Sequence, residues 1–180
     1  MKIYFITGNK QKFAEACLVL PELEQLEIDL PEIQSLDSEV IIRAKLEEAF
    51  KHHAGPFVVE DNSLHLECLS GLPGPLIKWF LQTIGSDGLA DLAAKYNNSK
   101  AKARVMIGYA QDRGNVHFFA GEVDGDIVPR ETSEGFGWDV IFRPRGHEHT
   151  FSTMTDAEKN QISMRGQAFS HLKQFLNNSR

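Results

Sequence analysis

The chain has 180 residues, of which 42% are hydrophobic and 24% are charged, and its net charge is −6 at pH 7. These values fit one globular domain over residues 1–180, and no segment approaches the roughly 20 apolar residues that a membrane span requires. The acidic excess argues against a nucleic-acid-binding surface, because affinity for a phosphate backbone depends on an excess of Lys and Arg.

Two features indicate a cytoplasmic protein. The N-terminus lacks the long apolar stretch of a secretory signal, since polar Thr7 follows after only a few apolar residues. Cys17 and Cys68 are far apart and form no CxxC pair, which is typical of a reducing compartment with little disulfide or metal–thiolate chemistry.

Strands and helices are expected to alternate in the first part of the chain. Apolar runs and periodicity predict strands at 2–6, 26–30 and 57–59 and helices at 10–20 and 39–53. Pro31 would end the second strand, and Asp37 or Ser38 would cap the second helix.

The second part of the chain predicts a loop, short helices and a hairpin. Residues 71–75 (GLPGP) are too rich in Gly and Pro for regular structure, and short helices are expected at 76–84 and 88–96. Strands at 102–111 and 115–124 would be joined by a turn at 112–114. Together these elements predict a single α/β domain with a mixed sheet.

The C-terminal part predicts two helices. Thr155 and Glu158 form a capping box that would begin the first. We expect a break near 160–163, with Ser163 capping a second helix, because Lys159 and Arg165 on one unbroken helix would point about 120° apart. The alternative for these two cations is a solvated basic face.

The stretch TGNKQK places an unusual set of polar residues where a strand meets a helix. The N–H groups of a helix N-terminus bind anions, and Gly8 would let a phosphate approach the backbone. Thr7 and Asn9 add donors, and Lys10 and Lys12 add positive charge. The alternative is an ordinary turn in which Asn9 caps the helix and the lysines are solvated.

Carboxylates follow two later strands. Glu32 comes after IDLP, and Glu60 and Asp61 come after FVV. If the strands run parallel, these side chains share one edge of the sheet with the first turn, where α/β proteins bind ligands. Mg²⁺ prefers such oxygen ligands together with phosphate and water. The alternative is that acidic residues simply gather in exposed loops.

Aromatic residues cluster in a glycine-containing segment, EGFGWDVIFRPRG, at 134–146. Phe136, or Trp138 beside it, could stack on a nucleobase, and Asp139 could accept a hydrogen bond from a ring N–H. The alternative is a buried aromatic cluster that includes Trp138 or Phe142.

Taken in order, the motifs TGNKQK, LPEIQ, EDNSL, GLPGPLIKWF, FGWDVIF and EKNQIS resemble those of the inosine triphosphate pyrophosphatase family. The resemblance runs from Ile3 to about Leu176. It implies an elongated single α/β domain with a long mixed sheet flanked by helices. It also implies a homodimer that hydrolyses ITP, dITP and XTP to the monophosphate and pyrophosphate with Mg²⁺.

The resemblance also implies roles for residues that would handle the phosphates. Thr7 to Lys12, which includes Gly8, Asn9 and Lys10, would hold the triphosphate, and Lys45 would reach it from its helix. Glu32 and Asp61 would bind Mg²⁺. Asp61 would also activate the attacking water, with Lys12 as the second catalytic residue.

A second set would contact the nucleoside. Asn62 would lie against the nucleotide, while Phe136, Gly137, Trp138 and Asp139 would cover and read the base. Lys159 and Arg165 would contact its keto groups, next to Met164.

Two positions depart from the family pattern. Met164 stands where the family usually has His, and a thioether is at best a weak acceptor. Ser63 stands where Gly is usual. The alternatives are therefore a pyrophosphatase for other modified nucleoside triphosphates and, from another class, a nucleotide-binding module without catalysis. In every case the expected partner is a small-molecule nucleoside triphosphate, without nucleic acid or membrane.

Overall fold

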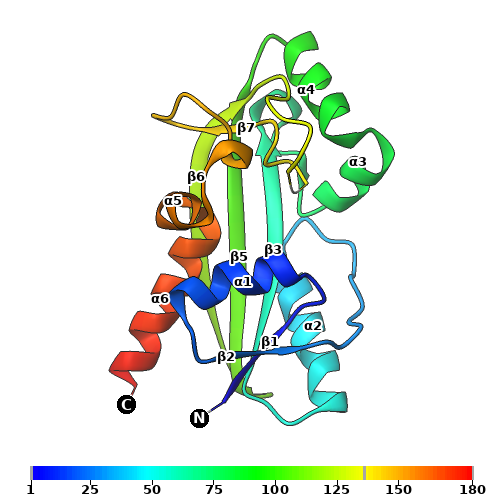
Figure 1. The fold of residues 1–180 in the computed structure, drawn as a ribbon. Coiled ribbons are helices and arrows are strands. Elements are labelled where there is room, and N and C mark those ends of the chain that lie inside the picture. Colours follow the sequence, from blue (N-terminus) through cyan, green and yellow to red (C-terminus); the bar gives the residue numbers. More distant parts are fainter. Residues whose placement is uncertain (1, 136, 180) are drawn as a thin grey trace. The chain divides into compact units, whose positions relative to one another are not determined.

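The computed structural model describes residues 2–135 and 137–179 of the chain. This part forms seven strands: β1 (Ile3–Ile6), β2 (Leu23–Leu26), β3 (Phe57–Leu66), β4 (Pro73–Gly74), β5 (Lys100–Asp112), β6 (Asn115–Ile127) and β7 (Phe142–Pro144). It also forms six α-helices (Figure 1): α1 (Lys10–Val19), α2 (Ser38–His52), α3 (Ile77–Thr83), α4 (Gly85–Lys95), α5 (Asp156–Ile162) and α6 (Met164–Asn178). Short 3-10 helices lie at Glu67–Leu69 and Phe151–Thr153.

All seven strands belong to one mixed sheet, which confirms the predicted fold class. The strand order is β2-β1-β3-β5-β6-β7, and β4 pairs with β3 outside this path. β1 runs parallel to both β2 and β3, whereas β4 is antiparallel to β3 and β7 is antiparallel to β6. In the register of β1 with β3, Tyr4 lies beside Phe57 and Phe5 beside Val58.

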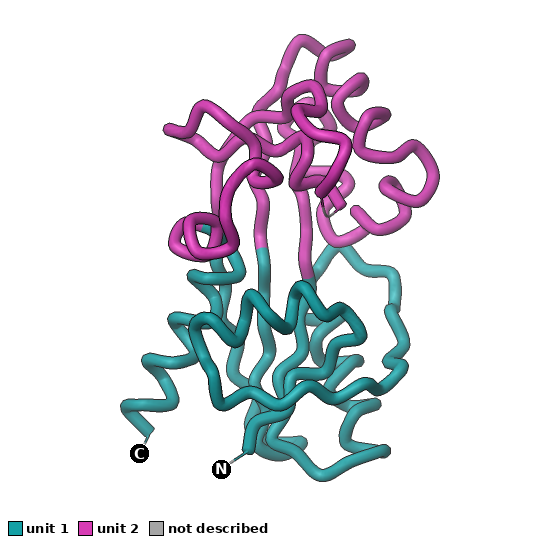
Figure 2. The backbone as a smooth tube through the Cα atoms, in the orientation of Figure 1, with its two compact units in different colours: residues 1–61, 105–121, 163–180 teal, residues 62–104, 122–162 magenta. Residues whose placement is uncertain are grey.

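The chain divides into two compact units (Figure 2). Unit 1 comprises residues 1–61, 105–121 and 163–180, and unit 2 comprises residues 62–104 and 122–162. β3, β5 and β6 contribute residues to both units.

In unit 1, helix α2 covers one face of the sheet. Its residues Ile42, Leu46 and Ala49 form a buried cluster with Ile6 of β1, Phe57 and Val59 of β3, and Met106 and Ala110 of β5. The packing is close at Gly108, where an added Cβ would lie 2.2 Å from Cγ2 of Ile42. Ile42, Leu46 and Ala49 are spaced at i, i+4 and i+7, and this spacing correctly predicts the buried face of α2.

The opposite face of the sheet in unit 1 is covered by α6, which lies beside α1. The ring of Phe5 in β1 packs edge-on against Phe169 of α6, with the ring centroids 5.3 Å apart. Tyr109 of β5 packs in the same way against Phe175. Since successive side chains of a strand point to opposite faces, Phe5 packs on the α6 side of the sheet and Ile6 packs on the α2 side.

The predicted strand at 26–30 is wrong in its position. β2 occupies Leu23–Leu26, with Ile3 beside Leu23 and Ile6 beside Leu26 in the register. Ile28 and Leu30 alternate correctly because they pack against the core cluster, but they do so without ladder pairing. Alternation reports which side chains are buried, and it does not show that the backbone pairs.

The predicted strand at 57–59 is too short, because β3 continues to Leu66. Glu60 and Asp61 thus lie within the strand and not after its end. Within the GLPGP loop, Pro73 and Gly74 pair with the far end of β3, which the prediction missed. The short strand β7 was also not predicted.

The predictions for the remaining elements are confirmed within one to three residues. Asp112 accepts hydrogen bonds from the backbone N–H groups of Gly114 and Asn115 in the hairpin turn. Glu158 accepts from the backbone N–H of Thr155, and Thr155 accepts from that of Glu158, so the capping box forms. Among the described residues, no helix is both long and apolar enough to cross a membrane.

Candidate functional site

The turn between β1 and α1 is shaped by its own polar side chains. Oδ1 of Asn9 accepts a hydrogen bond from the backbone N–H of Lys12 (3.0 Å), and Oγ1 of Thr7 accepts from that of Asn9 (3.1 Å). Gln25 of β2 donates to the carbonyl of Thr7 at 2.8 Å and holds the turn against the sheet. A Cβ added at Gly8 would meet nothing within 4 Å, so one side of the turn is open. The predicted N-cap is confirmed, and the open side leaves room for an anion.

A buried cluster of charged side chains lies next to this turn. It consists of Lys12 and Glu15 of α1, Glu60 of β3 and Arg165 of α6. The Arg165 guanidinium makes a two-pronged contact with Glu60, from Nε to Oε2 at 2.8 Å and from Nη2 to Oε1 at 2.9 Å, and it also contacts Glu15 through Nη1. Nζ of Lys12 lies 3.0 Å from Oε1 of Glu60. We call these four residues the acid–base cluster.

The acid–base cluster holds Glu60 and Arg165 in their charged forms. Burial alone would raise the pKa of Glu60, but Arg165 and Lys12 outweigh it and hold this pKa well below its usual range. Burial likewise opposes the charge of Arg165, yet Glu60 and Glu15 raise its pKa further above the ordinary value. A buried guanidinium with carboxylate partners on two sides is the geometry that Arg serves best.

Asp61 lies on the other side of β3, toward α2. Burial raises the pKa of its carboxyl group, although a hydrogen bond with the Ser38 side chain and the charge of Lys45 oppose the rise. Oδ2 of Asp61 is buried and has no hydrogen-bond partner among the described residues. A buried carboxylate oxygen without a partner is costly, so a ligand or a metal ion would relieve it.

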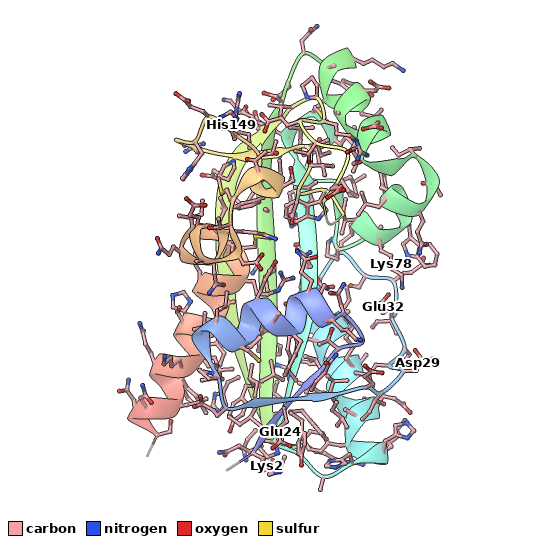
Figure 3. All side chains as sticks on the ribbon, in the orientation of Figure 1. Lys2, Glu24, Asp29, Glu32, Lys78 and His149 are labelled. Carbon is pink, nitrogen blue, oxygen red and sulfur yellow. The ribbon has the colours of Figure 1, made fainter. Side chains whose placement is uncertain are left out.

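Lys45 of α2 points to the same place. Its Nζ donates to the backbone carbonyl of Glu60 at 3.0 Å and lies 3.8 Å from Oε1 of Glu32. Burial lowers the pKa of Lys45, and the charges of Asp61 and Glu32 oppose this effect. Glu32 extends from the connection between β2 and α2, as does Asp29 (Figure 3), and its side chain is about half exposed at 47%.

The strand explains how these groups meet. Successive residues of β3 alternate, so Glu60 faces α1 and α6 while Asp61 faces α2. β1 ends at Ile6, and continuing its register with β3 would bring Thr7 level with Glu60. Beyond Ile6 the turn replaces the neighbouring strand, and side chains from both faces of the sheet converge there.

Unit 2 contains a second polar pair. Nζ of Lys159 in α5 lies 2.6 Å from Oδ2 of Asp139, and both side chains are less than 10% exposed. The ammonium group also lies 5.8 Å from the ring centroid of Phe151. Trp138, which is only 3% exposed, packs edge-on against Phe142. The buried-core interpretation of Trp138 and Phe142 is therefore confirmed.

The other residues predicted for the site have varied surroundings. Asn62 is half-buried, and its Oδ1 has no partner in the described part of the chain. Gly137 has a positive φ of 59°, which suits glycine. Lys10 is exposed, and Met164 is buried at the start of α6. Phe136 lies outside the described residues.

The predicted break between the two C-terminal helices is confirmed. α5 ends at Ile162, and Oγ of Ser163 accepts a hydrogen bond from the backbone N–H of Gly166 at the start of α6. Lys159 belongs to unit 2 and Arg165 to unit 1. Their joint contact with a base stays a prediction.

Thus Lys12, Lys45, Glu32 and Asp61 lie close to one another within unit 1. Thr7 lies in the turn that precedes α1. Their contacts with a triphosphate stay predictions. Asp139 and Lys159 meet within unit 2.

Three neighbours of this site were not assigned from sequence. Glu15 lies three residues after Lys12 on α1, a spacing that puts both on one helix face and could have indicated a pair. The sequence indicates Ser38 only as a possible helix cap, but Asp37 takes that role by accepting from the N–H of Glu39. For Glu60 the sequence indicates a carboxylate without a separate role. Its partner Arg165 is 105 residues away in sequence, so spacing gives no signal.

Similar proteins support the resemblance inferred from the motifs. The chain is 42% identical to an inosine triphosphate pyrophosphatase of Schizosaccharomyces pombe, over 97% of this chain and 94% of that protein. It is 41% identical to an inosine triphosphate pyrophosphatase of Pyricularia oryzae, over 95% of this chain and 91% of that protein.

Solved structures show the same fold. A HAM1 protein from Coxiella burnetii matches with a TM-score of 0.84 at 22% identity, over 99% of both chains. A nucleoside-triphosphatase, dITP/XTP pyrophosphatase, from Mycobacterium abscessus matches with a TM-score of 0.72 at 26% identity, over 96% of this chain and 98% of that one. The sequence profile of the Ham1 family matches residues 3–175. The chain therefore belongs to the Ham1 family.

Proposed function

We propose that this protein hydrolyses noncanonical purine nucleoside triphosphates, namely ITP, dITP and XTP, to the monophosphate and pyrophosphate. The observation that carries the proposal is the meeting of Lys12, Lys45 and Asp61 beside the open turn at Gly8. Relatives named inosine triphosphate pyrophosphatase, at 41–42% identity over nearly the full length, support it.

The triphosphate binds at the turn. Backbone N–H groups at the start of α1 and the side chains of Thr7 and Asn9 supply donors, while Lys10, Lys12 and Lys45 supply positive charge. Oγ1 of Thr7 and Oδ1 of Asn9 already accept bonds within the turn, and their hydroxyl and amide hydrogens are the groups that would donate to phosphate oxygens.

A divalent cation, which we take to be Mg²⁺, fits the same place. Asp61 has a buried oxygen that needs a partner, and Glu32 brings a second carboxylate close to Lys45. Hard oxygen donors of this kind, completed by phosphate oxygens and water, are what Mg²⁺ requires. When bound, the cation would neutralise charge on the phosphates and favour departure of pyrophosphate.

The chain's own groups supply the remaining chemistry. Asp61 accepts a proton from the attacking water, whose oxygen forms a bond to the α-phosphorus while the bond from that phosphorus to the bridging oxygen of pyrophosphate breaks. The raised pKa of Asp61 brings this base closer to neutral pH, where proton transfer is more effective. Lys12 and Lys45 stabilise the negative charge that develops on the phosphate oxygens.

Recognition of the base is assigned to the Asp139–Lys159 pair of unit 2, and contacts of Asn62, Gly137 and Arg165 with the nucleotide stay predictions. Hypoxanthine presents a keto oxygen next to a ring N–H. An ammonium donor and a carboxylate acceptor held side by side match that pattern, and they mismatch adenine, which presents an amino group next to a bare ring nitrogen. The buried ring of Trp138 supports this segment from the core.

The test is product identification with ITP and Mg²⁺. We expect inosine monophosphate and pyrophosphate in equal amounts, and Asp61→Asn should lower kcat at least about 100-fold while nucleotide binding persists. Glu32→Gln tests the second proposed ligand of the cation. Its matched control is Asp29→Asn, because Asp29 lies on the same connection, is exposed and has no proposed role. Orthophosphate as the product, or unchanged turnover in Asp61→Asn, would refute the assignment.

Met164 favours a second candidate, a pyrophosphatase for other modified nucleoside triphosphates. Its side chain is only 1% exposed, and it has no hydrogen-bond donor at a position where the family usually has His. A panel of ITP, XTP and modified pyrimidine triphosphates, compared by kcat/KM, separates the two candidates.

A further inference from the structure

We propose that Glu60 is a positioning residue of the phosphate site, which fixes Lys12 through its carboxylate and Lys45 through its backbone carbonyl. The inference rests on the proposed function and deepens it, because it names the group that aims the two lysines. Glu60 itself does not touch the substrate in this proposal.

The carboxylate of Glu60 bridges two cations. Its Oε1 lies 3.0 Å from Nζ of Lys12 and 2.9 Å from Nη2 of Arg165, while Oε2 takes the second prong from Nε. Lys12 and Arg165 would repel each other without this shared oxygen. The Lys12 side chain is 23% exposed, so it has room to turn into solvent once the attraction is gone.

The backbone of Glu60 acts separately on Lys45. The ammonium group of Lys45, whose side chain is 12% exposed, donates to the Glu60 carbonyl at 3.0 Å. A substitution that changes only the side chain keeps this carbonyl. One residue therefore offers two distinct anchors, and the side-chain anchor can be tested while the carbonyl anchor is kept.

The acid–base cluster is also balanced in charge. Lys12 and Arg165 carry two positive charges, and Glu15 and Glu60 carry two negative charges, so a ligand is not needed to hold the cluster together. Lys12 is thus already in place when a polyphosphate arrives, and such preorganisation reduces the ordering cost of binding.

The test compares Glu60→Gln with Glu15→Gln. Both remove one buried carboxylate that contacts Arg165, and the structure shows an ion pair between Glu60 and Lys12 at 3.0 Å. Binding of inorganic tripolyphosphate is measured by calorimetry without metal, and kcat and KM are measured with ITP and Mg²⁺. We expect Glu60→Gln to weaken tripolyphosphate binding about tenfold or more and to lower kcat, and we expect the loss of tripolyphosphate binding in Glu15→Gln to be clearly smaller.

A double-mutant cycle covers the case in which Glu60→Gln is less stable. If Glu60 acts through Lys12, then Glu60→Gln should weaken tripolyphosphate binding in the parent protein but hardly at all in a Lys12→Met background. Equal losses in the two backgrounds would overturn the inference. Unchanged or tighter binding in Glu60→Gln would also overturn it, because removal of a negative charge would then act only through net charge.

The binding arm separates this inference from the proposed function. If the parent protein does not hydrolyse ITP but binds tripolyphosphate in a Glu60-dependent way, the function is refuted and the positioning role is supported. If ITP is hydrolysed and both glutamine variants bind tripolyphosphate alike, the positioning role is refuted and the function stands.

Discussion

Replacement of Arg165 by Met tests how much the acid–base cluster contributes to stability. The Arg165, Glu15 and Glu60 side chains are each no more than 4% exposed. Met keeps much of the volume but leaves two buried carboxylates without their guanidinium. Removing one partner from a buried ion pair typically costs about 3–5 kcal/mol.

This loss is large against the total stability expected for such a chain, about 5–15 kcal/mol. For a chain of this size, 1 kcal/mol shifts the melting temperature by about 2–4 °C. We therefore expect a fall of about 6–20 °C at pH 7. Lys12 continues to pair with Glu60, which favours the lower part of this interval.

The pH dependence gives the sharper result. In the parent protein the pKa of Glu60 is held below its usual range, so its stabilising contribution is present above pH ~4.3 and is lost as the pH falls below that value. Without Arg165, the effect of burial is opposed mainly by Lys12, so the pKa of Glu60 rises. The folded variant then takes up protons more readily than the parent, and the difference in stability between the two proteins should shrink as the pH falls from 8 to 5.

The assay is urea unfolding at 25 °C and thermal unfolding, each at pH 8, 6.5 and 5. Glu15→Gln in the Arg165→Met background should recover part of the loss at pH 8, because it removes one of the two uncompensated charges. A loss below about 1 kcal/mol would show that the cluster is not a buried ion pair in solution. A constant difference across the pH series would refute the charge argument.

Three further predictions concern stability. The hydroxyl of Tyr109 is buried and has no hydrogen-bond partner in the described part of the chain, so Tyr109→Phe should leave stability unchanged or raise it by about 1 kcal/mol in urea unfolding; a clear loss would reveal a partner. Gly108→Ala should destabilise by about 1–3 kcal/mol through the contact with Ile42, and Ile42→Ala in the same chain should relieve the clash, as a double-mutant cycle of melting temperatures would show. The N–H of Thr150, followed by burial and the Thr150 hydroxyl, sets the pKa of Glu131, which is lowered overall. The stabilisation by Glu131 is present above pH ~4.3 and is lost as the pH falls below that value. Glu131→Gln should therefore make the free energy of unfolding fall less steeply with pH in this acidic range, and the same pH dependence in both proteins would contradict this.

Local signals in the sequence were sufficient for much of the fold. Helix caps at Asn9 and Ser163, the hairpin turn at Asp112 and the capping box at Thr155 each depend on neighbours within four residues. The same applies to the buried face of α2. These features are correctly predicted because their physical causes are local.

Pairing between distant strands set the limit of the prediction. Ile28 and Leu30 have the alternation of a strand, but only tertiary contacts decide that the paired segment is Leu23–Leu26. The length of β3 likewise depends on the strands that pair with it. The polar segment EDNS does not have the pattern of a strand, although the strand continues through it to Leu66.

The candidate site shows the same division. The turn at 7–12 and the carboxylate of Asp61 can be grouped from residue type and position, whereas Lys45 joins them only through the family motifs. The partners that hold them are not predicted, because Arg165 is separated from Glu15 and Glu60 by 150 and 105 positions in the sequence. The hydrogen bond between Ser38 and Asp61 likewise cannot be predicted from the sequence.

The neighbouring residues Glu60 and Asp61 serve two different layers of the protein, and this makes the segment before them intolerant of changes in length. Deleting Val58 would exchange the directions of the two carboxylates. Glu60, the partner of Arg165, would then face α2, and Asp61, the proposed base, would face α1 and α6. A shift by one position would therefore disable both arrangements at once, even though every side chain would still be present.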